Sequence, residues 1–103
     1  MTITEFVTLL ESIGMPVALN RFSETQKPPY IVYFDVGSEN FSADNVVYCE
    51  FINIDVELYT THVNDALENQ IKQLFTDNEI YYEWSRNWIE QEKIYQTTFE
   101  VII

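Results

Sequence analysis

Hydrophobic and polar residues alternate without interruption near the middle of the chain, along residues 52–59. Strict alternation predicts a strand that buries one side and leaves the other accessible. Because most residues on the buried side are β-branched, the strand assignment is strengthened. The whole segment 49–60 is long for a strand, so we expect it at the centre of a sheet. The predicted buried side holds Ile52, Ile54, Val56 and Leu58, and the other side holds Asn53, Asp55, Glu57 and Tyr59.

Two segments have the hydrophobic spacing of amphipathic helices. The first covers residues 3–13, with Thr2 and Glu5 at the spacing of a capping box and Gly14 as the stop. The second begins after Asn64, a favourable cap, and ends at residues 76–78. Its apolar stripe is Leu67, Ile71, Leu74 and Phe75, and Glu68 and Lys72 form a favourable pair four residues apart.

The remaining hydrophobic runs predict further strands. Residues 30–36 form one strand, residues 37–45 a turn-rich connection, and residues 46–60 the antiparallel partner. Residues 17–22 have a weak strand pattern, and residues 80–103 form a hairpin that turns near residues 89–92. The order of elements predicts a single α+β domain, residues 1–103, in which two helices pack on one face of an antiparallel sheet of four to five strands.

The charge is strongly unbalanced, with 17 acidic residues against 5 Lys and Arg and a net charge of −12. Nucleic-acid backbones and anionic membrane surfaces are therefore unfavourable direct partners. No apolar run approaches the roughly 20 residues of a membrane span. Three explanations of the acidity stay open: solubility of an aromatic-rich chain, contact with a basic partner, or a channel wall that repels DNA.

Candidate catalytic groups are few and lack partners. His62 could act as a base only if a group such as Asp65 oriented it, and Asp55 with Glu57 could form a carboxylate pair like that of a glycosidase. A solvated histidine and a solvated strand face are the favoured interpretations. Cys49 is the only cysteine, and the acidic residues lack the spacing of a calcium loop. We therefore expect no enzyme, no cofactor and no metal site.

Large aromatic residues gather in the first arm of the C-terminal hairpin. On a strand, Tyr82, Trp84 and Trp88 share one face, and Tyr81 points the other way. Core packing is the default use of such residues, and a protein interface is the alternative. Base stacking would need a basic groove, whereas Arg86 and Lys93 are the only cations nearby.

Several segments together resemble the small tail-completion proteins (tail terminators, or head–tail joining proteins) of long-tailed phages and prophages of Gram-positive bacteria. The matching segments are IGMPV at 13–17, PPYIVYF at 28–34, the AD dipeptide at 43–44 and VELYT at 56–60. The similarity spans nearly the whole chain, although Ala18–Leu19 stands where an aromatic residue is expected after Pro–Val.

The resemblance implies a structural role in the virion, after assembly in the host cytoplasm. Such proteins form a homo-oligomeric ring, commonly a hexamer, that caps the tail tube and joins it to the head–tail connector, and DNA passes through the ring. The matched segments are scaffold, so the resemblance implies no catalytic residue. The main alternative is an acidic inhibitor that mimics DNA, or another small protein-binding module. The candidate interface or channel-wall residues are Asp55, Glu57, Tyr59, Tyr82, Trp84 and Trp88.

Overall fold

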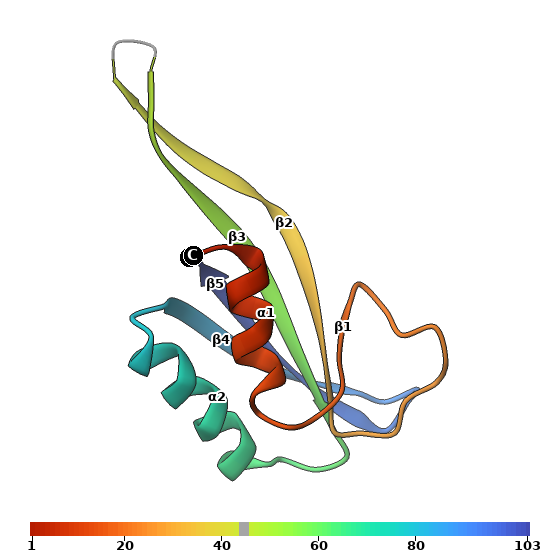
Figure 1. Ribbon diagram of the computed structural model, residues 1–103. Helices are drawn as coiled ribbons and strands as arrows, with labels where there is room; N and C mark the ends of the chain where they lie inside the picture. Colours follow the sequence, from red (N-terminus) through yellow and green to blue (C-terminus); the bar gives the residue numbers. More distant parts are fainter. Residues whose placement is uncertain (44–45) are drawn as a thin grey trace.

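The computed structural model describes the backbone of residues 1–43 and 46–103 and the side chains of residues 1–38 and 51–103. Within these residues, two helices and five strands form an α+β fold, which confirms the predicted class (Figure 1). The elements are α1 (Ile3–Glu11), β1 (Val17–Leu19), β2 (Tyr30–Ala43), β3 (Val46–Thr60), α2 (Asp65–Asp77), β4 (Tyr81–Ile89) and β5 (Ile94–Ile102).

The five strands form one sheet in the order β1-β2-β3-β5-β4. β3 lies at the centre, as its length predicted. The pairs β2–β3, β3–β5 and β4–β5 are antiparallel, but β1 runs parallel to β2. The sheet is therefore mixed, and the prediction of a wholly antiparallel sheet was wrong. The strand predicted over residues 17–22 is only three residues long, because Asn20 takes a positive φ of 62° and turns the chain away from the sheet.

β2 and β3 form a hairpin that projects past the rest of the sheet (Figure 1). Gly37 to Ala43 continue β2, so the prediction of a turn-rich connection over residues 37–45 was wrong for residues 37–43. Backbone pairing uses only N–H and C=O groups, so a strand can continue through a mostly polar segment without an apolar pattern. A register shift at Val36 leaves that residue unpaired beside Gly37, whose φ is 131°.

The core forms between the helices and the β3 side that carries Ile54, Val56 and Leu58, all fully buried as predicted. We call this side the inner face; it also includes Thr97, Phe99 and Val101 of β5. The opposite side, with Asp55, Glu57 and Glu100, is the outer face. Phe6 of α1 stacks on Phe75 of α2 at 5.8 Å between ring centroids. The main core cluster is Phe6, Leu10, Ile31, Ile54, Val56, Leu58, Ile71, Phe75, Ile80, Phe99 and Val101.

Local signals set the helix boundaries. The capping box of Thr2 and Glu5 is present, with each side chain accepting a hydrogen bond from the other residue's backbone N–H. Asn64 caps α2, because its side chain accepts a hydrogen bond from the backbone of Leu67 at 3.0 Å. The predicted C-terminal hairpin is also confirmed, and its turn is completed by Lys93 at a positive φ of 56°.

Candidate functional site

Three carboxylates stand side by side across the outer face. Asp55 of β3 is directly opposite Glu100 of β5, and Glu100 is directly opposite Glu83 of β4. Side chains at such positions lie roughly 5 Å apart at Cβ, so like charges destabilise the sheet. We call these three residues the acidic row. No ion pair described in the structure involves any of them, so the row presents net negative charge to its surroundings.

Glu57 and Tyr59 belong to the same outer face, two and four residues beyond Asp55. The Tyr59 hydroxyl donates to Glu57 Oε1 at 2.6 Å and accepts from Gln96 Nε2 at 2.8 Å. Burial and the neighbouring Glu57 carboxylate both raise the pKa of Tyr59 above its ordinary value. The Tyr59 ring also stacks on Tyr30 at 5.0 Å between centroids. This part of the face is therefore ordered by its own contacts.

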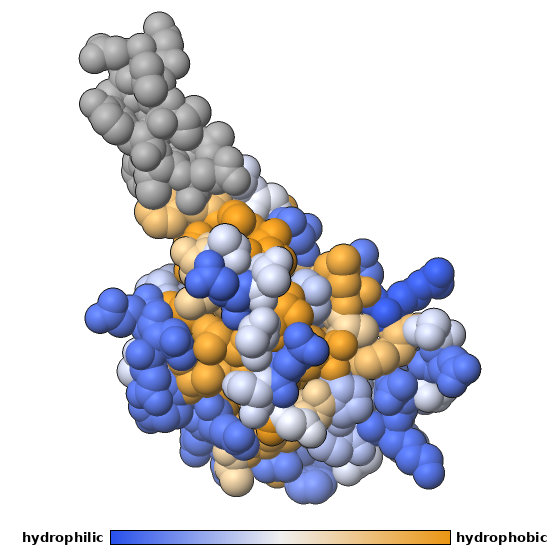
Figure 2. All heavy atoms as spheres, viewed as in Figure 1, coloured by the Kyte–Doolittle hydropathy of each residue, from blue (hydrophilic) through white to orange (hydrophobic). Residues whose placement is uncertain are grey.

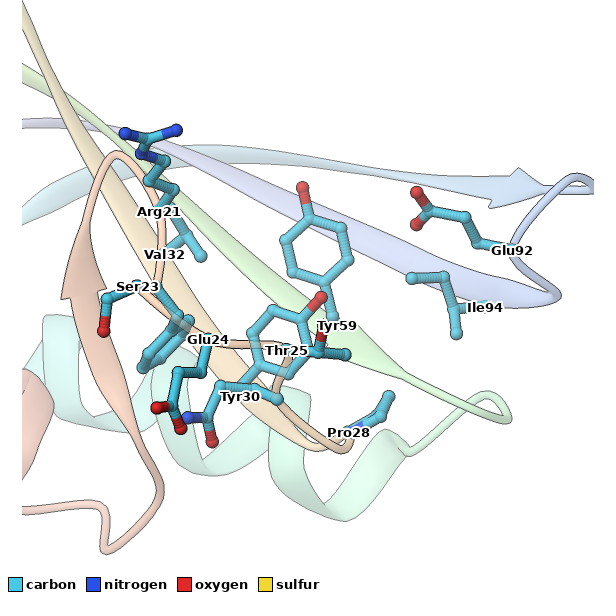
Figure 3. Close-up of a pocket in the computed structure, with 12 residues that line it drawn as sticks. Arg21, Ser23, Glu24, Thr25, Pro28, Tyr30, Val32, Tyr59, Glu92 and Ile94 are labelled. Carbon is cyan, nitrogen blue, oxygen red and sulfur yellow. The ribbon is translucent and has the colours of Figure 1, made fainter.

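The segment of residues 20–29 borders a cleft of about 640 Å³ at this end of the outer face (Figure 3). Tyr30 and Tyr59 form part of its wall, and Glu92 from the β4–β5 turn lies across from them. Phe22 packs edge-on against Tyr30 at 5.5 Å between ring centroids. The cleft is open and carries acidic and basic groups at its rim, so it lacks the enclosed apolar character of a typical small-molecule site.

Tyr82, Trp84 and Trp88 lie on the inner face of β4, as the alternation predicted. The Tyr82 ring packs against Phe75 at 5.6 Å and belongs with the core. The Lys72 ammonium lies 3.7 Å from the centroid of Trp84, a cation–π contact. The two tryptophans are 45% and 44% exposed, which leaves a large aromatic surface at the sheet edge. Figure 2 shows that hydrophobic and hydrophilic residues are mixed over the visible surface.

The six predicted candidates therefore divide between opposite faces of the sheet. Asp55, Glu57 and Tyr59 lie on the outer face, whereas the three aromatics of β4 lie on the inner face. They do not form one surface. Sequence reasoning missed Glu83 and Glu100, which complete the acidic row. Their alternation within β4 and β5 was visible, but the cross-strand register that aligns them with Asp55 was not.

A buried ion pair joins α2 to β4. Glu68 is 2% exposed, and its carboxylate accepts hydrogen bonds from Arg86 and from Thr97 Oγ1, the latter at 2.8 Å. These bonds lower the pKa of Glu68, although burial opposes the shift. The predicted partner Lys72 instead lies on Trp84 and adds only a weaker attraction. The sequence signals for this pair were a charged residue, Glu68, beside the apolar stripe of the helix and an arginine, Arg86, on the inward face of its strand.

The remaining sequence candidates are not assembled into a site. His62 is exposed and its Nδ1 lies 3.2 Å from Thr61 Oγ1, while the Asp65 carboxylate faces Arg86 at 3.8 Å. The Cys49 side chain lies outside the described residues. No group of three potential metal ligands occurs among the described residues. In the described part of the chain, neither helix is long and apolar enough to cross a membrane.

Searches against protein-family models and against curated proteins found no match to this chain.

Proposed function

We propose that this chain is a tail-completion protein that forms a ring on the tail tube of a long-tailed phage and joins it to the connector. The observation that carries the proposal is the acidic row of Asp55, Glu100 and Glu83 on the outer face. The resemblance described above supplies the class of assembly. In this proposal, the outer face lines the passage through which DNA moves.

A DNA passage requires a wall that does not hold phosphate. The acidic row repels a polyanion, and Glu57 adds a fourth carboxylate to the same face. The cost of placing like charges on adjacent strands is roughly 0.2–1 kcal/mol for each pair. Such an arrangement lowers the stability of the isolated chain. A function that uses the negative charge, such as repelling DNA, would explain why the chain carries it.

The projecting β2–β3 hairpin is a second feature that suits an assembled protein. β5 pairs with β3 only from Asn53 to Thr60, with one further backbone exchange between Ile52 and Ile103. The part of β3 that precedes Ile52 pairs with β2 alone. An isolated two-stranded ribbon is marginally stable in water, so contact with a neighbouring subunit or the tube would stabilise it.

Electron microscopy of the purified chain mixed with tail tubes tests the proposal. The tubes should come from a long-tailed phage that infects a Gram-positive host and whose own terminator has been removed. The expected result is a ring at one end of each tube and a uniform tube length, compared with uncapped, elongating tubes in the control. Free monomers together with unchanged tubes would contradict the proposal.

The acidic row also favours a second candidate, an inhibitor that mimics DNA. Carboxylates on adjacent strands, roughly 4.8 Å apart, form a regular row of negative charges, as the phosphates along a DNA strand do. Such an inhibitor would bind the basic site of a restriction or repair protein. A pull-down with such proteins, followed by competition with double-stranded DNA, distinguishes the two: release by DNA supports the inhibitor, and capping of tubes supports the terminator.

A further inference from the structure

β4 is an edge strand with little protection against pairing. It runs for nine residues, and one side of its backbone pairs with β5 while no described strand covers the other. Edge strands are commonly blocked by proline, charged side chains (lysine above all), inward-pointing charges, a bulge or short length. The segment YYEWSRNWI contains neither proline nor lysine, and its register with β5 shows no shift. Its charged residues are Glu83 and Arg86, and the inward-pointing Arg86 is paired with Glu68 of α2. The strand therefore offers a free row of backbone donors and acceptors.

The opposite edge of the same sheet is also incomplete. β1 pairs with β2 only from Ile31 to Tyr33, so β2 has no described neighbour on that side from Phe34 onward. Two apolar side chains are exposed along this edge, Leu19 at 51% and Val36 at 54%. Each copy of the chain thus carries two different unpaired edges, which we call the β4 edge and the β1–β2 edge.

The charges at the two edges are complementary. Arg21 and Lys27 lie in the segment of residues 20–29 beside the β1–β2 edge, and they take no part in the described ion pairs. Glu24 in the same segment leaves it with one net positive charge. At the other side of the sheet, the acidic row ends on β4 with Glu83, next to Glu100. In a chain of net charge −12, the segment of residues 20–29 is therefore a local excess of positive charge beside the β1–β2 edge, although β2 itself continues with the acidic residues Asp35 and Glu39.

We propose that a second copy of this chain docks its β1–β2 edge against the β4 edge, in a head-to-tail contact. The proposal rests on the ring of the proposed function and names the surfaces that build it. Arg21 and Lys27 of one copy face Glu83 and Glu100 of the next, so the carboxylates that stay unpaired along the passage in the assembled ring are Asp55 and Glu57. The backbone of β2 from Phe34 onward extends the sheet beyond β4.

Both faces of the sheet agree with this contact. On the inner face, exposed Trp84 and Trp88 meet Leu19, which shares the inner side with Tyr33. On the outer face, Arg21 lines the cleft beside Val32 and Tyr59, the side to which Glu83 belongs. A contact between two different patches is heterologous, and it closes into a ring when the rotation between copies permits. A two-fold dimer would instead bring like-charged edges together.

A charge-swap experiment tests the contact. The first variant reverses the basic edge with Arg21→Glu and Lys27→Glu, and the second reverses the acidic edge with Glu83→Lys and Glu100→Lys. Sedimentation equilibrium up to about 1 mM protein, the concentration range of very weak association, measures self-association. Each variant alone should associate at least about tenfold more weakly than the wild type, the effect of losing roughly 1.4 kcal/mol.

Mixing the two variants supplies the decisive result. An equimolar mixture should recover association to within a few fold of the wild type, because the reversed acidic edge of one variant now matches the reversed basic edge of the other. Native mass spectrometry should show complexes in which the two variants alternate. The matched control for the variant with the reversed acidic edge is Glu11→Lys with Asp77→Lys, two exposed sites on the helices with the same change in net charge as Glu83→Lys with Glu100→Lys, which should associate at least as well as the wild type.

The outcomes separate this contact from the proposed function. If the wild type stays monomeric, or if the mixture associates no better than either variant alone, the head-to-tail contact is wrong. If either variant alone forms rings on tail tubes as the wild type does, this contact is wrong and the tail-completion role stands. If the swap behaves as expected and no protein caps tubes, the contact stands and the tail-completion role fails.

Discussion

Arg86 on the edge strand β4 donates two hydrogen bonds to the buried carboxylate of Glu68 on α2, one of them from Nε to Oε2 at 2.9 Å. Thr97 on β5 donates a third bond to the same carboxylate. The interaction joins residues 18 positions apart and links α2 to the outermost strand. It therefore fixes the position of the β4 edge relative to the core.

Replacing Arg86 by alanine should destabilise the chain substantially. Removing one partner of a buried ion pair costs roughly 3–5 kcal/mol, because the other charge stays buried. The Arg86 side chain is 26% exposed, so water can reach the site and we expect a smaller loss of about 2–3 kcal/mol. Urea denaturation measures the loss. Asp65→Asn is the control, because this carboxylate is 81% exposed at 3.8 Å from Arg86 and should change stability little.

The same pair predicts a pH dependence. Hydrogen bonds from Arg86 hold the pKa of Glu68 below its ordinary value of 4.5. A lowered pKa in the folded state gives stability above the unfolded-state pKa, and this stability is lost as the pH falls through the folded-state pKa. The unfolding free energy of the wild type should therefore exceed that of Glu68→Gln by a constant amount at neutral pH.

Below about pH 4.5 this difference should shrink, since protonation removes the charge that only the wild type carries. Urea titrations of both proteins between neutral pH and about pH 2 measure it, and relief of repulsion in the acidic row affects both proteins alike. A difference that grew on acidification would show that Glu68 is not stabilised as a carboxylate.

Neutralising the centre of the acidic row should stabilise the isolated chain. Glu100 is the member with a like charge on both sides, so Glu100→Gln removes two repulsive pairs. We expect a gain of about 0.5 kcal/mol or slightly more, seen as a rise in Tm of roughly 2–4 °C. The gain should fall in high salt, where the repulsion is screened. Glu24→Gln, an exposed acid outside the helices and strands, should give no comparable gain at low salt.

The Tyr59 hydroxyl should contribute to stability through Glu57 and Gln96. Tyr59→Phe keeps the ring that stacks on Tyr30 but removes both hydrogen bonds, and the expected cost is about 1 kcal/mol. In an alkaline absorbance titration, the variant should also lack one late-ionising tyrosine, because burial raises the pKa of Tyr59. Tyr81→Phe is the control: its hydroxyl bonds Glu83 on an exposed surface, and its loss should not change stability measurably.

The sequence predicted the elements that pack against the core. Strict alternation over residues 52–59 fixed the strand and the buried side, and the capping residues Thr2 and Asn64 fixed the helix starts. Both signals are local and follow from burial and hydrogen bonding. They are reliable wherever a segment has one face in the core.

The failures arise where a strand continues through mostly polar residues or where distant residues meet. Residues 37–43 extend a strand with polar residues because pairing in the β2–β3 hairpin needs only backbone groups. The acidic row depends on the register between three strands, which no single segment encodes. Glu68 was assigned to the neighbouring Lys72, whereas its partner Arg86 comes from another element. The periodicity of one segment does not show which residues of other elements it will contact.

The division of the candidate residues between two faces predicts two separable defects. Under the proposed function the outer face lies along DNA, and under the proposed head-to-tail contact the β4 edge meets a neighbouring copy. Asp55→Lys with Glu57→Lys should raise affinity for double-stranded DNA, because each lysine can replace a counterion at a phosphate. Trp84→Ala with Trp88→Ala should leave DNA affinity unchanged and weaken self-association, since both rings are exposed at the docking edge.

Fluorescence anisotropy with a DNA duplex at about 50 and 200 mM salt measures the first defect, and the gain should diminish at the higher salt. Sedimentation equilibrium measures the second. Each pair serves as the control for the other, because both change two side chains on the same sheet. Lysines at positions 55 and 57 that left DNA affinity unchanged, in a protein still able to cap tubes, would mean that the outer face does not line the passage. Loss of self-association in both pairs would contradict the separation of the two faces.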